Sequence, residues 1–170
     1  MVPFFQNGRY MTQKEMTIGY SVYRNPEEFP PQAEALFREA VSALDSAYSP
    51  YSHFQVGAAL RLSNGIIVRG SNQENASYPT GLCAERTAIF FAGSQYPGEI
   101  IEALVVVARR QEETELVPAC PCGGCRQAML EYEERQGRPF PLYFKLSAHY
   151  WVSVSSVASL LPFKFDSASL

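Results

Sequence analysis

TGLCAERT at residues 80–87 and PCGGCRQ at residues 121–127 are the two stretches around which the rest of this chain is arranged. Together they supply three thiols, those of Cys83, Cys122 and Cys125. Each stretch lies between a segment with strand character and one with helical character, which is where open α/β sheets form ligand crevices. Cys122 and Cys125 are three residues apart on a predicted first helical turn, so both can bind one ion.

The donor set is typical of a catalytic rather than a structural zinc site. A structural site closes its tetrahedron with a fourth Cys or His, whereas a catalytic site leaves that corner to water. The remaining cysteine, Cys120, is too close to Cys122 in the sequence to form an ordinary chelating pair with it. We therefore expect one Zn²⁺ per subunit, bound by three sulfurs.

Two charged residues follow the first of these thiols. Glu85 is not needed as a ligand and is placed to carry protons between water and a substrate, or else it only stabilises a helix N-terminus. Three thiolates on a divalent ion leave one net negative charge, which weakens the ion as a Lewis acid unless a cation offsets it. Arg86 is expected to do so by donating to a thiolate; the alternative is a solvated helix residue.

Composition limits the possible partners. With 170 residues, 46% of them hydrophobic, the chain is long enough for one domain and too short for two. A net charge of −3 and a pI near 5.4 argue against nucleic acid, so we expect a small-molecule partner. The sequence shows neither an apolar leader nor a membrane span, which would need about 18 apolar residues. Because metal thiolates need reducing conditions, the expected location is the cytoplasm.

Apolar periodicity predicts the elements. Residues 1–30 are expected to form an N-terminal extension with an edge strand at 17–23, and residues 31–170 the main domain. Further strands are expected at 54–62, 66–70, 104–108, 141–146 and 150–154, the first two joined by a hairpin turn and the last two antiparallel. Helices are expected from 31 to before Pro50, from 83 to 92 closed by Gly93, from 124 to 135 stopped at Gly137, and from a Ser155 cap to Leu160.

This order of strands and helices predicts an α/β fold. Alternation of strand and helix in the middle of the chain implies crossover connections and helices on both faces of the sheet. We therefore expect a three-layer α/β/α sandwich with a mixed sheet of about five strands.

Four motifs, taken in order, resemble the free-nucleoside cytidine deaminases. They are YSPYSHFQVGAA at 48–59, NQENASY at 72–78, CAERTA at 83–88 and PCGGCRQ at 121–127. The resemblance runs from about residue 31 to the C-terminus. It implies the cytidine deaminase-like fold and the hydrolysis of cytidine or deoxycytidine to uridine or deoxyuridine with release of ammonia, a step of pyrimidine salvage. It also implies that Cys83, Cys122 and Cys125 bind zinc and that Glu85 is the proton donor and acceptor.

The resemblance further implies substrate contacts. Asn72 and Glu74 are similar to the pair that hydrogen-bonds the ribose 3′-hydroxyl, and a carboxylate there would repel a phosphate; the alternative is that they only shape a loop. Phe54 resembles the aromatic residue that stacks on the pyrimidine, although an ordinary core residue fits the pattern too. Ala84 also occupies a substrate-contact position of the motif.

Three more positions concern the assembly. Ala76, Tyr78 and Phe165 resemble positions that reach a neighbouring subunit's site, which implies a homodimer or homotetramer with shared active sites.

Two other functions stay open on sequence grounds. A zinc deaminase acting on an aminonucleoside antibiotic or on a base in nucleic acid would keep the same metal chemistry. The intact loop at 72–75 argues against the antibiotic, and the acidic pI and the short link between the last two strands argue against nucleic acid. The third possibility is a non-catalytic module in which zinc only pins two helices together.

Overall fold

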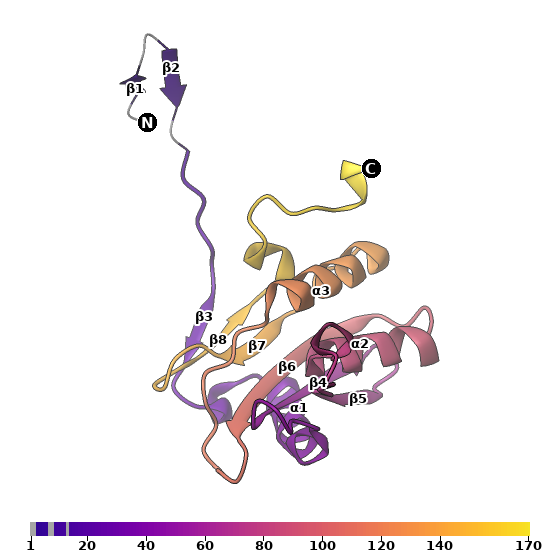
Figure 1. Ribbon diagram of the computed structural model, residues 1–170. Helices are drawn as coiled ribbons and strands as arrows, with labels where there is room; N and C mark the ends of the chain where they lie inside the picture. Colours follow the sequence, from indigo (N-terminus) through magenta and orange to yellow (C-terminus); the bar gives the residue numbers. More distant parts are fainter. Residues whose placement is uncertain (1–2, 7–8, 13) are drawn as a thin grey trace.

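The computed structural model describes residues 3–6, 9–12 and 14–170, and the main part of the chain has three layers (Figure 1). The middle layer is a six-stranded sheet with the order β3-β8-β7-β6-β4-β5. The helix α1 (Pro31–Ala43) covers one face, and α2 (Ala84–Gln95) and α3 (Gly123–Gln136) cover the other. The predicted α/β/α fold is confirmed, with one strand more than the five or so expected.

The sheet is mixed, as predicted. Its only parallel pair among the described residues is β6 with β7, and its other neighbours run antiparallel. Its strands are β3 (Ser21–Tyr23), β4 (Phe54–Leu62), β5 (Ile67–Ser71), β6 (Ile101–Arg110), β7 (Leu142–Lys145) and β8 (Trp151–Val154). A separate antiparallel pair is formed by β1 (Pro3–Gln6) and β2 (Arg9–Thr12), which the sequence patterns did not predict.

The predicted edge strand exists but is shorter than expected. Only residues 21–23 of the segment 17–23 pair with β8, with Ser21 opposite Ser153. Since β8 ends at Val154, which lies opposite Tyr20 in this register, residues before Tyr20 have no strand beside them to extend the pairing. Tyr23 fixes this strand to the core because its ring lies edge-on to Phe29, with 5.0 Å between the ring centroids. The division of the chain at residue 30 stays a prediction.

Several predicted element ends were wrong. The helix expected to run to just before Pro50 ends at Ala43 and is followed by the 3-10 turn η2 (Leu44–Ser46). The helix α2 does not stop at Gly93 but continues to Gln95, and a Cβ at Gly93 would lie 2.2 Å from the Tyr132 hydroxyl oxygen, so this glycine allows close packing of α3. The last helix is a 3-10 turn, η4 (Val157–Leu160), and Ser156 rather than Ser155 caps it by accepting from the Ala158 amide at 3.2 Å. The expected stop of α3 at Gly137 is confirmed.

The sheet separates two apolar clusters that place the helix starts. One cluster, between the sheet and α1, includes Leu36 and Trp151; the other joins the sheet to α2 and α3 and includes Ala88, Cys125 and Met129. The second cluster brings the N-termini of α2 and α3 to the same side of the sheet. Among the described residues, every helix is too short or too polar to cross a lipid bilayer.

The contact between α2 and β5 at Gly70 can be tested. A Cβ at Gly70 would lie 2.4 Å from the Ala84 carbonyl oxygen and 2.6 Å from the Ala88 amide nitrogen. We therefore expect Gly70→Ala to displace α2 and to lower the free energy of unfolding by about 1–3 kcal/mol in urea denaturation. The control is Gly19→Ala, where a Cβ meets nothing within 4 Å and the change should stay below about 0.5 kcal/mol. Equal stability of the two variants would contradict this packing.

Candidate active site

Three sulfurs from two helix starts meet in one cluster. Cys83 directly precedes α2, Cys122 directly precedes α3, and Cys125 lies in the first turn of α3. The sulfur of Cys122 is 3.9 Å from that of Cys83 and 3.5 Å from that of Cys125, and all three lie within 4.8 Å of one another. Tetrahedral zinc with Zn–S bonds of about 2.3 Å needs ligand sulfurs about 3.8 Å apart, so the cluster fits a zinc ion.

The backbone leaves these sulfurs free for a metal. Cys83 and Cys122 both have extended backbone angles at the N-cap positions, and neither side chain caps its helix. The fourth cysteine, Cys120, lies outside this group of three. Its residue is exposed as a whole, but partial burial of its thiol raises the pKa of that thiol.

Arg86 lies beside the first sulfur. Its Nη2 is 3.9 Å from the Cys83 sulfur and 3.4 Å from the Gly81 carbonyl oxygen. A hydrogen bond with Cys125, aided by Arg86 and Cys122, lowers the pKa of Cys83 to about 5 against the effect of burial. The same hydrogen bond with Cys83, together with burial of the Cys125 thiol, raises the pKa of Cys125. These contacts favour a thiolate partner over a solvated arginine at position 86.

Glu85 is a buried acid on the wall of the same cleft. Glu85 is only 4% exposed and lines the cleft. Desolvation is the main cause that raises the pKa of its carboxyl group, and the charge on Cys83 adds to the effect. A carboxyl group with a raised pKa can both accept and donate a proton near neutral pH. This position is unlike that of a surface glutamate that only stabilises a helix N-terminus.

The cleft next to the sulfurs is large enough for a nucleoside-sized molecule. Its volume is about 770 Å³, within the range usual for small-molecule sites. Four of the predicted substrate residues line it, and three do not. Those that line it are Phe54, Asn72, Glu74 and Tyr78; those outside it are Ala76, Ala84 and Phe165.

Asn72 and Glu74 also hold the walls of the cleft. The Asn72 amide accepts from the Val56 N–H at 2.8 Å and donates to the Phe54 carbonyl at 2.9 Å. Glu74 accepts from the Tyr51 N–H at 2.9 Å and from the N–H and hydroxyl of Ser52. Burial alone would raise the pKa of Glu74, but these hydrogen bonds lower it, so the carboxylate stays charged. The loop-shaping interpretation of both residues is therefore supported by contacts.

Comparison with known proteins agrees with this geometry. Residues 30–136 match the family model described as the cytidine and deoxycytidylate deaminase zinc-binding region. The chain belongs to this deaminase family. A cytidine deaminase from Sporosarcina psychrophila is 40% identical over 137 residues, which cover 81% of this chain and 93% of that protein. One from Halalkalibacterium halodurans is 48% identical over 98 residues, covering 58% and 70% of the two chains.

A solved structure confirms the fold. The crystal structure of cytidine deaminase from Burkholderia pseudomallei is 41% identical, has a TM-score of 0.62, and covers 77% of this chain and 97% of its own. The protein is thus a hydrolytic deaminase enzyme, and it carries the family's zinc-binding region with a three-cysteine cluster able to hold the metal.

The three residues outside the cleft have different surroundings in this deaminase. Ala84 is fully buried where α2 packs on β5, Ala76 is exposed, and Phe165 is 60% exposed while its carbonyl accepts from Gln127.

Sequence reasoning missed several residues that line the cleft. Val56 could have been found, because it alternates with Phe54 along β4 and so lies on the same face. Val106 could not, because a strand buried on both faces shows no alternation that tells one face from the other. Further lining residues include Tyr51, Ser52, Ala119 and Cys120.

Cysteine substitutions test the metal cluster of the deaminase. Cys122→Ser should lower zinc affinity by at least about 100-fold, because it removes one of the three sulfurs that lie close enough together to share an ion. Cys120→Ser is the matched control, since its sulfur is in the same loop but outside the cluster, and it should keep one zinc per chain. Chelator competition gives the zinc affinity, and metal analysis gives the zinc content per chain. Equal zinc loss in both variants would show that the cluster is assigned wrongly.

Proposed function

We propose that this enzyme deaminates free cytidine and deoxycytidine to uridine and deoxyuridine with release of ammonia, as a step of pyrimidine salvage. The observation that carries the proposal is that the three sulfurs cluster beside one cleft, whose wall includes Cys83, Cys122 and the buried Glu85. The relatives named cytidine deaminase support the same substrate class.

The proposed chemistry divides between the metal and the chain. When bound by Cys83, Cys122 and Cys125, zinc supplies a Lewis acid that makes water acidic enough to react near neutral pH. Glu85 accepts the first proton of the attacking water and delivers it to the pyrimidine ring nitrogen; it then takes the second proton from the hydroxyl added to the ring carbon and delivers it to the departing amine, which leaves as ammonia while the carbonyl forms. Its burial keeps competing water away and raises its pKa toward the range in which both transfers are possible. Arg86 offsets the negative charge of the sulfurs.

The cleft walls suit a neutral nucleoside. Phe54 and Val56 present apolar surface where a pyrimidine ring could stack, and Asn72 fixes the backbone of both. Glu74 keeps a negative charge at the cleft and would repel a phosphate at the sugar. Together with the net charge of −3, this favours free nucleosides over nucleotides and nucleic acid.

We also propose a homodimer or homotetramer with shared active sites, located in the cytoplasm. Tyr78 is 74% exposed at the cleft, and Phe90 and Phe91 farther along α2 are 44% and 52% exposed, so the chain presents exposed apolar side chains that a second copy could cover. Ala76 and Phe165 would then complete a neighbour's pocket. The reducing cytoplasm would keep the three thiols available for the metal.

Replacement of Glu85 separates the enzyme from a non-catalytic zinc module. We expect Glu85→Gln to lower kcat by at least about 10²–10⁴-fold while zinc content and the urea midpoint stay the same, because only the proton carrier is lost. Conversion of cytidine, followed by ultraviolet absorbance, gives the rate. Glu131→Gln, on the exposed face of α3, is the control and should behave as the parent. Unchanged turnover in the Glu85 variant would rule out the proton-carrier role.

A substrate panel tests the proposed specificity. Ammonia release should be observed with cytidine and deoxycytidine, and should be several-fold slower with cytidine 3′-phosphate, because of repulsion by Glu74. An aminonucleoside antibiotic and single-stranded DNA should not be deaminated. If neither free nucleoside reacts while one of the other compounds does, the proposed substrate is wrong.

A further inference from the structure

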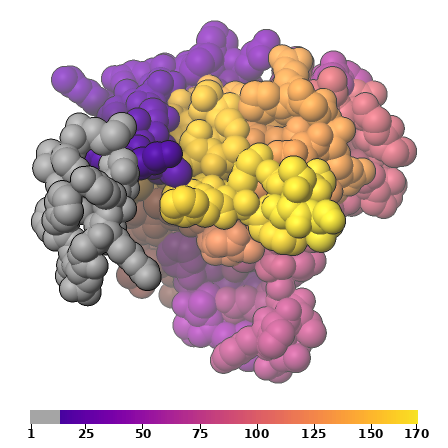
Figure 2. All heavy atoms as spheres, turned by 90° about the horizontal axis from the view of Figure 1, so that it is seen from above, coloured from indigo at the N-terminus to yellow at the C-terminus, as the bar shows by residue number. Residues whose placement is uncertain are grey.

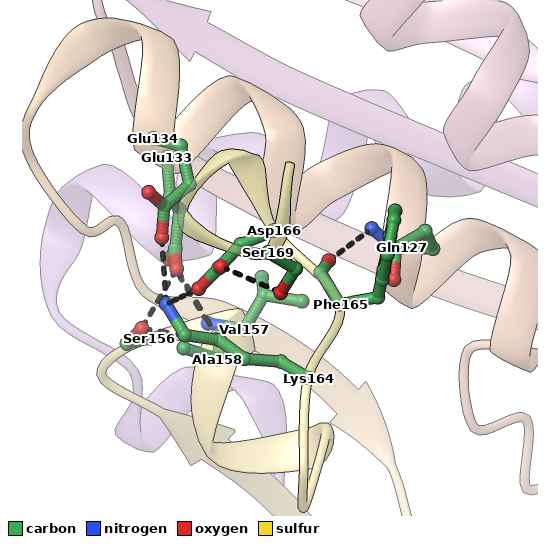
Figure 3. Close-up of polar contacts among 10 residues, drawn as sticks. All are labelled: Gln127, Glu133, Glu134, Ser156, Val157, Ala158, Lys164, Phe165, Asp166 and Ser169. Atoms are coloured by element: carbon green, nitrogen blue, oxygen red, sulfur yellow. Dashed lines mark hydrogen bonds and ion pairs between the residues drawn. The ribbon is translucent and has the colours of Figure 1, made fainter.

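A short turn near the C-terminus is held at both of its ends by one helix. At the start of η4, Glu133 of α3 accepts from the Val157 N–H at 2.9 Å and the Ala158 N–H at 3.3 Å, and from the Ser156 hydroxyl at 2.7 Å (Figure 3). At the end of η4, Arg126 Nη1 donates to the Leu160 carbonyl oxygen at 3.1 Å. Polar groups at both ends of the turn are thereby satisfied.

The two clamping residues are spaced to face the same way. Arg126 and Glu133 are seven residues apart, two helical turns, and so lie on one face of α3. Figure 2 shows the C-terminal residues, in yellow, against the orange atoms of the α3 region. Further contacts hold the chain beyond the turn, since the Gln127 side-chain amide donates to the Phe165 carbonyl and Lys164 pairs with Glu134 (Figure 3).

The same Arg126 also holds the loop that carries two of the sulfurs. Its Nε donates to the Pro121 carbonyl oxygen at 2.8 Å, directly before Cys122, and Arg126 itself directly follows Cys125. One guanidinium thus links the carbonyl before the cysteine pair to the carbonyl at the end of η4. Because the guanidinium is planar and its N–H directions are fixed, the positions of the two carbonyls are coupled.

We propose that Arg126 is a positioning residue for the metal centre and that the docked turn η4 is the support that keeps Arg126 in place. Cys122 is exposed and does not cap α3, so its sulfur is fixed by the backbone on either side of it. Release of η4 removes one of the two anchors of the guanidinium, and the Pro121 carbonyl then moves more freely. The inference rests on the proposed zinc ligands.

Cobalt(II) is the probe, because its visible absorption reports the geometry of a thiolate site independently of turnover. Arg126→Lys keeps the charge but cannot span both carbonyls. Glu133→Gln replaces one acceptor oxygen with a donor, which weakens the hold on the start of η4, and on Phe140, away from the sulfurs. We expect each to weaken cobalt and zinc affinity about 10–100-fold and to shift the cobalt spectrum. Glu134→Gln is the matched control, since this exposed neighbour contacts only Lys164 in the tail, and it should leave both readings unchanged.

The outcomes separate a structural clamp from a positioning role. If Glu133→Gln lowers the urea midpoint but leaves the metal affinity and the cobalt spectrum unchanged, η4 only stabilises the fold and the inference is wrong. If Glu133→Gln does not fold, Ser156→Ala, which removes one donor to Glu133, takes its place with the same expected direction. A parent protein that binds no cobalt would overturn the proposed zinc site and this inference together, whereas normal binding by the parent and both variants would overturn the inference alone.

Discussion

Three sulfurs can share one ion only if two helices begin at the same point in space. Cys83 and Cys122 are the residues directly before α2 and α3, so a displacement of either helix by the width of one atom would open the cluster. The contact of α2 with β5 at Gly70, and the apolar packing of both helices on one face of the sheet, supply this precision. Gathering three thiolates is unfavourable by itself, because like charges repel. A divalent ion, two helix N-termini and Arg86 offset that repulsion.

Two buried carboxylates illustrate how the same chemical group serves different purposes in this fold. Glu133 accepts four hydrogen bonds, from the amides of Phe140, Val157 and Ala158 and from the Ser156 hydroxyl, so its oxygens are used to join α3 to the C-terminal segment. Glu85 instead faces the cleft, and desolvation raises its pKa. A buried carboxyl group that is desolvated beside other negative charge is unfavourable for stability in its ionised form, which is typical of residues retained for chemistry.

Much of this arrangement could be predicted from the sequence, because local patterns determine it. The alternation along β4, the hairpin after Leu62 and the spacing of the three cysteines identified the sheet and the metal cluster. Features that depend on distant contacts could not be predicted. Gly93 lies inside α2 at a point where Tyr132 packs too closely to leave room for a Cβ, and β8 ends at Val154, one residue beyond its last pair with the edge strand. The surroundings of Ala84 and Phe165 likewise depend on how β5 and α3 lie beside them.

The electrostatics of the cleft show why loop support and substrate choice can reside in one residue. The bonds from Tyr51 and Ser52 lower the pKa of Glu74, so the contacts that shape the loop also keep the carboxylate ionised. A unit negative charge about 5 Å away would be repelled by about 1 kcal/mol in water and about 3 kcal/mol at an effective dielectric constant of 20. Because Glu74 is partly exposed, the lower part of this range applies. Even that repulsion disfavours a phosphate several-fold, while a neutral hydroxyl can donate to the same oxygens. The proposed preference for nucleosides therefore needs no residue beyond those that build the wall.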